Sequence, residues 1–308
     1  MRYRFQPWQL ALLVILLCTA AVVLIHQHRV SRSYGAADLV ELLPAERAAH
    51  VYIDVALLRN TGILDLLAGS KAAEEPDYRR FANEIGFDYR TDLDAVAAAF
   101  LHGDEYFTLR GRFDWRRLNA YAESQGGSCR NAICTMPAST PERHISFYPV
   151  KSNIMALAVS KDERGTDMIG LGQWKSAPRL PGEPVWVSVP SYMFSDVSSL
   201  PAGTHAFLTP LAQAQEITFA VGPAGQGLQI RLEVACSSPD AAADLTRQLS
   251  STTDLLKKMI ERQHMTPNPK DLSGVLVAGV FAQQDRKVNG TWPLDRGFVE
   301  ALASGEVQ

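Results

Sequence analysis

With 308 residues, 46% of them hydrophobic and 20% charged, the sequence has the composition of a globular protein large enough to bury a core. Its net charge is −3, and from Ala36 onward 26 basic residues stand against 33 acidic ones. This mildly acidic balance argues against nucleic acid as a partner, because phosphate binding needs a net basic face.

The N-terminus carries an apolar segment between two basic flanks. Residues 8–25 read WQLALLVILLCTAAVVLI and contain no charge; as a helix they would extend about 27 Å, close to the hydrocarbon thickness of a bilayer. A cleavable signal peptide normally has a shorter apolar core, and a buried core helix would show a polar face that this segment lacks. We therefore predict a signal anchor over residues 1–30, with residues 8–25 spanning the membrane.

The flanking charges bear on orientation. Arg2 and Arg4 precede the apolar segment, and Arg29 and Arg32 follow it. Together with the α-amine they give a small bias towards an N-terminus inside the cell. We expect a single-pass cell-membrane protein whose remaining residues lie outside the cytoplasm, with the lipid bilayer as the partner of residues 8–25.

After a polar tether over residues 31–46, a first half is predicted over residues 47–172. β-branched and aromatic residues alternate in its strands, and apolar residues recur at helical spacing in its helices. In chain order the pattern predicts a strand at 51–55, helices at 56–68 and 77–85, strands at 93–101 and 105–113, a helix at 114–125, and strands at 145–148 and 154–159.

A second half is predicted over residues 184–308, after a boundary rich in Gly and Pro at 172–184. Pro239 is favoured in a first helical turn, and Asn289-Gly290 predicts a hairpin turn. In chain order the expected elements are a strand at 185–189, a poorly periodic stretch with helical character near 205–214, strands at 216–221 and 228–236, a helix at 239–263, a strand at 275–281 and a helix at 296–303.

Each half reads as strand, helix, strand, strand, helix, strand. We therefore predict an α+β fold, with an N-terminal transmembrane helix followed by two similar β-α-β-β-α-β halves that have mainly antiparallel sheets. Residue identity between the halves is negligible, so any duplication is ancient or only architectural.

No group of residues has the spacing of a catalytic, cofactor or metal site. His26 and His28 form an HxH pair without further ligands nearby, whereas a metal site needs three or four. Residues 222–227 lack the Lys-Ser/Thr of a phosphate loop and lie between strands. We expect no cofactor, no metal and no catalytic residue, although a triad built from distant loops is recognised by geometry and not by order.

Cys129 and Cys134 flank four residues in GGSCRNAICTMP. These residues can fold back as a turn, with Asn131 suited to its tight part, and this brings the α-carbons within disulfide range. We predict a disulfide, against the alternatives of two reduced cysteines or a two-cysteine metal site. A disulfide requires an oxidising compartment, which favours an extracytoplasmic location. Cys236 continues the apolar phase of its strand and is expected to be a free, buried thiol.

The tryptophans after the anchor divide into two groups. Trp115 and Trp186 fall inside apolar patterns and are expected in the core. Trp174 and Trp292 fall in predicted loops and are candidate surface anchors, because exposed tryptophan is enriched in binding surfaces.

Two stretches of the first half carry a resemblance, LLPAERAAHVYIDVALLRNTGILDLL at 42–67 and GRFDWRRLNAYAESQGG at 111–127. They resemble uncharacterised bacterial single-pass, membrane-anchored exported proteins. The resemblance implies an envelope location and assigns no functional residue.

The leading functional hypothesis is a membrane-anchored, non-catalytic module outside the cytoplasm that binds an envelope protein or another envelope component. The first alternative is a hydrolase-type enzyme whose site is assembled from distant loops. A deep pocket with two or more ionisable side chains within hydrogen-bond reach would favour it. The second alternative is a transmembrane signalling subunit.

Overall fold

The computed structural model describes residues 34–67, 76–171, 174, 180–194, 210–212, 214–225, 227–264 and 266–304. Residues 36–308 form one compact unit. The predicted anchor over residues 1–30, with its span 8–25, lies outside the described residues. Within the described part, no helix is long and apolar enough to cross a membrane.

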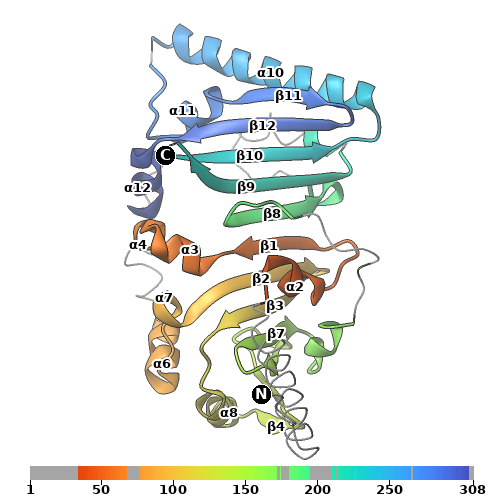
Figure 1. The fold of residues 1–308 in the computed structure, drawn as a ribbon, viewed down its shortest axis with the longest axis vertical. Helices are drawn as coiled ribbons and strands as arrows, with labels where there is room; N and C mark the ends of the chain where they lie inside the picture. The colour runs from red at the N-terminus through yellow and green to blue at the C-terminus, as the bar shows by residue number, and fades with distance from the viewer. Residues whose placement is uncertain are drawn as a thin grey trace, which may run out of the picture. The chain divides into compact units, whose positions relative to one another are not determined.

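Twelve strands of the described chain form one sheet, in which every neighbouring pair is antiparallel (Figure 1). Their order across the sheet is β11-β12-β10-β9-β8-β1-β2-β3-β7-β6-β5-β4. The strands are β1 (Ala49–Ile53), β2 (Leu93–Leu101), β3 (Asp104–Gly111), β4 (Ser128–Arg130), β5 (Ile133–Pro137), β6 (His144–Lys151), β7 (Ile154–Ser160), β8 (Val185–Pro190), β9 (Glu216–Ala224), β10 (Gly227–Ala235), β11 (Val280–Gln284) and β12 (Lys287–Leu294).

Along the chain, the described helices come before, between and after these strands. They are α2 (Ala36–Glu41), α3 (Val55–Asn60), α4 (Ile63–Leu67), α6 (Pro76–Ile85), α7 (Tyr89–Asp92), α8 (Trp115–Ser124), α10 (Pro239–Arg262), α11 (Leu272–Val277) and α12 (Arg296–Ser304), with 3₁₀ turns η1 (Gly165–Met168) and η2 (Ser191–Phe194). The long helix α10 begins as its sequence predicts, because Ser238 caps the Ala241 amide and Pro239 occupies the first turn.

The predicted fold class is wrong, because the strands belong to one continuous sheet. β1 and β8, each predicted to open a half, pair with each other: His50 lies opposite Ser188, and Ile53 lies opposite Val185. This pair joins seven strands from the first part of the chain to five from the second. The transmembrane helix of the same prediction has no counterpart among the described helices. A strand's alternation gives its two faces but not its neighbours, so the pattern did not reveal the β1–β8 pair.

Two local predictions in the second part are also wrong. Residues 275–281, predicted as one strand, divide between α11 and β11, because the Asp271 side chain caps α11 within an apolar stretch that also suits a strand. Asn289-Gly290, predicted as a turn, lies inside β12. The hairpin turns instead at Asp285, whose φ is 52°.

One face of the sheet, which we call the helical face, carries three apolar clusters. They are packed by α3 and α4, by α6 and α8, and by α10, α11 and α12. Strand register places one uninterrupted row of mostly apolar residues across this face: Cys134, Phe147, Leu157, Phe107, Ala98, Val51, Val187, Phe219, Leu232, Gly290 and Phe281.

The opposite face differs between the two parts of the sheet. In the first part, α2 and η1 pack on it, and the fully buried alanines Ala95, Ala97 and Ala99 leave room for them. The Thr108 hydroxyl donates to the Leu39 carbonyl of α2 at 2.9 Å. In the second part the same face carries polar side chains from β9, β10 and β12, namely Thr218, Arg231, Glu233, Asn289 and Thr291.

Candidate functional site

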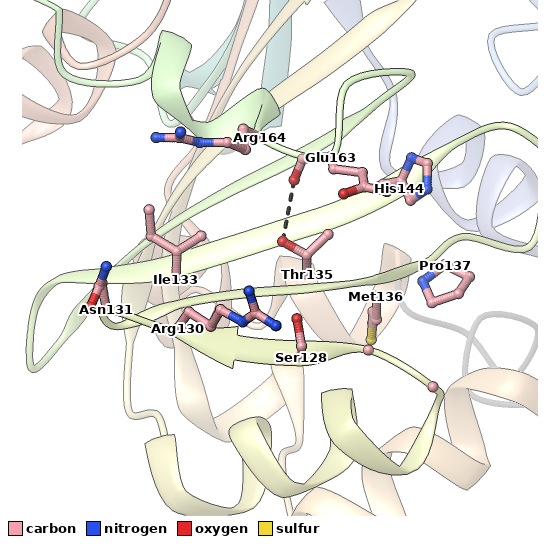
Figure 2. A pocket seen from close by; sticks show the side chains of 12 residues that line it. Ser128, Arg130, Asn131, Ile133, Thr135, Met136, Pro137, His144, Glu163 and Arg164 are labelled. Carbon is pink, nitrogen blue, oxygen red and sulfur yellow. Dashed lines mark hydrogen bonds and ion pairs between the residues drawn. The ribbon is translucent and has the colours of Figure 1, made fainter.

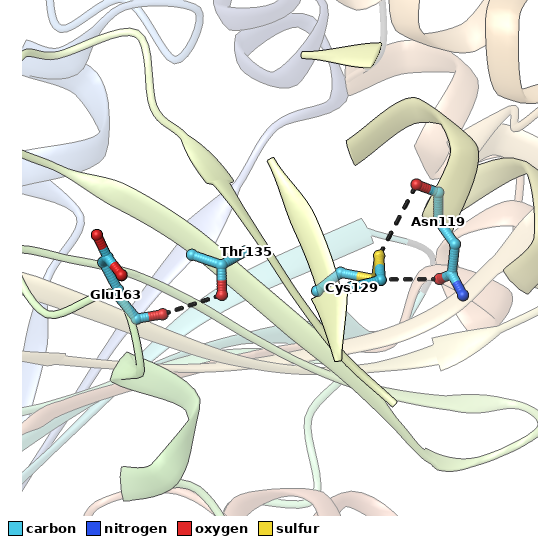
Figure 3. Close-up of a disulfide and its surroundings, with 5 residues drawn as sticks. Asn119, Cys129, Thr135 and Glu163 are labelled. Atoms are coloured by element: carbon cyan, nitrogen blue, oxygen red, sulfur yellow. Dashed lines mark hydrogen bonds between the residues drawn. A yellow bond between two sulfur atoms is a disulfide. The ribbon is translucent and has the colours of Figure 1, made fainter. Parts of the chain in front are cut away.

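The predicted disulfide between Cys129 and Cys134 is present and closes the β4–β5 hairpin (Figure 3). The two cysteines face each other in register, with their α-carbons 4.0 Å apart. Asn131 and Ala132 form the two-residue turn, and both have positive φ, as the primed hairpin turns require. Cys236 is a free, buried thiol, also as predicted, and burial raises its pKa.

The disulfide lies against α8. The backbone carbonyl oxygen of Asn119 lies 3.8 Å from the Cys129 sulfur, and its side-chain Oδ1 lies 3.2 Å from the Cys134 sulfur (Figure 3). Cys134 is only 1% exposed and belongs to the core cluster under α8. The bridge therefore fixes the last, three-residue strand of the sheet to the core.

A polar cleft of about 640 Å³ lies on the other side of this hairpin (Figure 2). Glu163 and Arg164 stand opposite the β5 side chains, and the Thr135 hydroxyl donates to the Glu163 backbone carbonyl at 3.2 Å. His144 Nε2 lies 3.7 Å from Glu163 Oε1, beyond ordinary hydrogen-bond length. Arg164 is paired with Asp167 at 2.7 Å. Among the described residues of this cleft, no hydrogen bond joins a carboxylate or an imidazole to a hydroxyl group.

A second polar cleft of about 360 Å³ lies on the exposed face of β9, β10 and β12. Arg231 pairs with Glu183 at 2.7 Å, and Lys287 pairs with Glu233. Each charge is paired with its opposite: the Lys287–Glu233 pair is about half exposed on both sides, whereas the Glu183 side chain is only 14% exposed. A solvated pair such as Lys287–Glu233 contributes at most about 1 kcal/mol to stability.

Two apolar cavities lie on the helical face, beneath its helices. The first, which we call the α3 cavity, has a volume of about 270 Å³ and lies between α3, α4, α12 and the ends of β8, β9 and β10. The second, the α11 cavity, has a volume of about 210 Å³ and lies under α10, α11 and α12. Ile230 and Phe298 line both cavities, so the two are adjacent.

The cavity walls contain almost no polar side chain. In the α3 cavity the one polar side chain among the described lining residues is that of Thr61, whose hydroxyl donates to the Leu57 and Leu58 carbonyls at 2.9 and 3.1 Å. In the α11 cavity the one polar group of the described lining is the indole of Trp292. Apolar cavities of about 150 Å³ stay dry and bind small apolar molecules.

Trp292 is not a surface anchor, because it is only 7% exposed. It lies in β12 rather than in a loop, and its ring packs edge-to-face on Phe281 at a centroid distance of 5.2 Å. Trp174 is half-buried; its indole donates to the Leu43 carbonyl at 3.1 Å, and its ring lies 5.1 Å from that of His50. Its role as a surface anchor stays a prediction.

The sequence did not indicate the cavities. Their walls consist mainly of Leu, Ile, Val and Phe from strands and helices that the pattern assigns to the core, and an unfilled core position has the same periodicity as a filled one. No metal-ligand cluster of three or more His, Cys, Asp or Glu occurs among the residues that the structure describes. His26 and His28 lie outside them.

No protein-family model matches the chain, and no curated protein matches it. Among solved structures it is similar to three crystal forms of TP0453. Form III has a TM-score of 0.49 at 12% identity, covering 87% of this chain and 96% of that one. Form IV has 0.47 at 12%, covering 88% and 97%, and form I has 0.45 at 13%, covering 89% and 97%. Likeness at this level assigns no function.

Proposed function

We propose that this chain is a non-catalytic module outside the cytoplasm that binds an envelope component through an aliphatic chain. The supporting observation is the pair of adjacent apolar cavities under α3, α11 and α12. Together they reach the size of small-molecule sites, which occupy about 300–1,000 Å³. Among the described residues their walls hold no charged side chain, so a ligand would be held there by dispersion contacts and by the hydrophobic effect. The part of a ligand that fits such walls is a hydrocarbon chain.

The apolar walls of these cavities give a bound chain a source of free energy. Leu57 in the wall of the α3 cavity is 43% exposed, so this cavity is open to solvent. Moving apolar surface from water into an apolar environment is favourable by about 25 cal/mol per Å². A hydrocarbon chain that covers these walls would therefore be stabilised by the hydrophobic effect.

The location outside the cytoplasm is supported by the Cys129–Cys134 disulfide, because such bridges persist in oxidising compartments. Attachment to the cell membrane through the apolar segment 8–25 is part of the same proposal and rests on the sequence alone. A module at the membrane surface would meet lipids as its commonest envelope component.

The proposal is tested by measuring the binding of a fluorescent alkyl probe to the full chain, kept soluble by an amphipathic polymer. Val185 on β8 lines the α3 cavity, so Val185→Phe should fill it and weaken probe binding at least tenfold. Val187 lies on the same strand and the same face outside both linings, so Val187→Phe is the matched control and should bind within about twofold of the wild type. Absence of binding to the wild type, or equal loss in both variants, refutes the proposal.

A further inference from the structure

The α3 cavity and the α11 cavity are separated by two side chains. Ile230 and Phe298 are the described residues that line both cavities, and every other described lining residue belongs to one cavity alone. Ile230 lies on β10 in the sheet, and Phe298 lies on α12 in the helix layer that covers it. One side chain from the sheet and one from the helices therefore form the boundary between the cavities.

The Phe298 side chain is held in place by the first turn of α12. The Asp295 side chain accepts a hydrogen bond from the Gly297 N–H at 2.7 Å, and the Asp295 carbonyl accepts one from the Phe298 N–H at 3.1 Å. Such bonds satisfy the free amides at the start of a helix and fix its first turn. Phe298 is only 7% exposed, so its ring is part of the core rather than of a mobile lid.

The floor of the α3 cavity ends at this boundary. Strand register places Val185 of β8, Val221 of β9 and Ile230 of β10 side by side in one row, and all three line the cavity. Two strand spacings measure about 10 Å, roughly the length of an extended chain of eight carbon atoms. α3 packs on the Val185 end of the row, and its Leu57 is 43% exposed. A chain can therefore enter beside Leu57 and reach Ile230 and Phe298 with its far end.

We propose that Phe298 sets the length of the hydrocarbon chain that this site accepts, and that the ligand is an amphiphile with a chain of about eight carbon atoms. This inference rests on the proposed function. Each methylene that enters the α3 cavity should strengthen binding about fourfold, because its burial removes apolar surface from water. A longer chain reaches the α11 cavity only by displacing a buried ring, so additional methylenes bring no gain. The described lining holds no charged side chain, so the polar group of the ligand stays outside, at the Leu57 opening.

The experiment lets n-alkanols from hexanol to dodecanol compete with the fluorescent alkyl probe for the full chain in the amphipathic polymer. For each alkanol, the dissociation constant of a variant is divided by that of the wild type, so partition of the alkanol into the polymer cancels. Phe298→Ala opens the way into the α11 cavity, and its ratio should be at least about tenfold lower for dodecanol than for hexanol. Val299→Ala is the matched control, because Val299 is its neighbour in α12, is 6% exposed and lines the α3 cavity alone. Its ratio should be the same for all alkanols within about twofold.

Two further measurements protect the test against misfolding of Phe298→Ala. Phe298→Leu keeps a core-sized aliphatic side chain and should show the same trend by a smaller factor. In the wild type, dodecanol should shift the methyl resonances of Val185 and leave unchanged those of Val275, which lines the α11 cavity alone. A shift of the Val275 methyls in the wild type, or ratios independent of chain length in both Phe298 variants, overturns the inference while the proposed function stands. If the wild type does not bind the probe, the proposed function fails, and the inference fails with it.

Discussion

Removing the Cys129–Cys134 bridge should lower the free energy of unfolding by an amount set by the length of the loop that the bridge closes. The perturbation is the double substitution Cys129→Ser and Cys134→Ser, or reduction of the wild type. The bridge closes a loop over a sequence separation of five, and closure of so short a loop restrains the unfolded chain by roughly 2 kcal/mol. For a body of this size, that corresponds to a fall of about 4 °C in the melting temperature.

The bridge also contributes to packing in the folded protein. Cys134 is 1% exposed in the cluster under α8, and both sulfurs contact Asn119. Opening the hairpin therefore exposes core surface, so the loss should appear in global unfolding and not only as fraying of β4. Amide hydrogen exchange should report the weakest protection in residues 128–137 once the bridge is broken.

The assay is urea unfolding of the wild type and the double variant, each with and without reductant. Reductant should lower the wild-type midpoint towards that of the variant and leave the variant unchanged, because the remaining described thiol, Cys236, is buried and free. Equal midpoints for oxidised and reduced wild type would show that the bridge does not restrain the unfolded chain and would refute the reasoning.

Four further outcomes are expected. Burial lowers the pKa of His50 below its ordinary 6.5, against the opposing effect of its hydrogen bond to a backbone carbonyl, so the unfolded chain takes up the proton first. Stability should therefore fall as pH drops below about 6.5, by at most about 1.4 kcal/mol per pH unit, and His50→Gln should flatten that slope in urea titrations. Thr108→Val leaves the Leu39 carbonyl without its donor and should cost about 1–2 kcal/mol in thermal unfolding; an unchanged melting temperature would contradict the α2 contact. Ala132→Gly, which relieves a left-handed residue of φ 67°, should stabilise the hairpin by less than about 1 kcal/mol; a loss of protection there would disprove the turn assignment. A chain without residues 1–30 should leave the membrane fraction after lysis, and continued sedimentation with membranes would show that another surface attaches it.

Local signals in the sequence predicted most strands and the longest helix. The alternation in residues 228–236 and the proline at 239 each act within a few residues, and β10 and α10 lie where these signals place them. The errors occur where two local signals compete. In residues 275–281 the apolar run suits a strand, but the cap at Asp271 starts a helix. At Asn289-Gly290 a favoured turn dipeptide lies inside β12, because pairing with β10 on one side and β11 on the other extends the strand through it.

Local signals of this kind do not specify which distant strands pair with each other. The β1–β8 contact joins residues about 130 positions apart, and every strand with a hydrophobic face is an equally good neighbour by pattern. The disulfide was predictable because its two cysteines lie within one hairpin. The burial of Trp292 was missed because the turn predicted at Asn289-Gly290 placed this residue in a loop, whereas it lies in β12.

The α3 cavity lies where the two parts of the sheet meet. Val185 of β8 lines it, and the helices in its wall come from both parts of the chain, with α3 and α4 from the first and α12 from the second. α12 contacts α4, and the buried Phe298 of α12 belongs to the lining of both cavities. The α11 cavity is lined by residues of the second part alone. A site whose walls come from helices far apart in the chain has no motif of its own, so the periodicity of each helix predicts only its buried face.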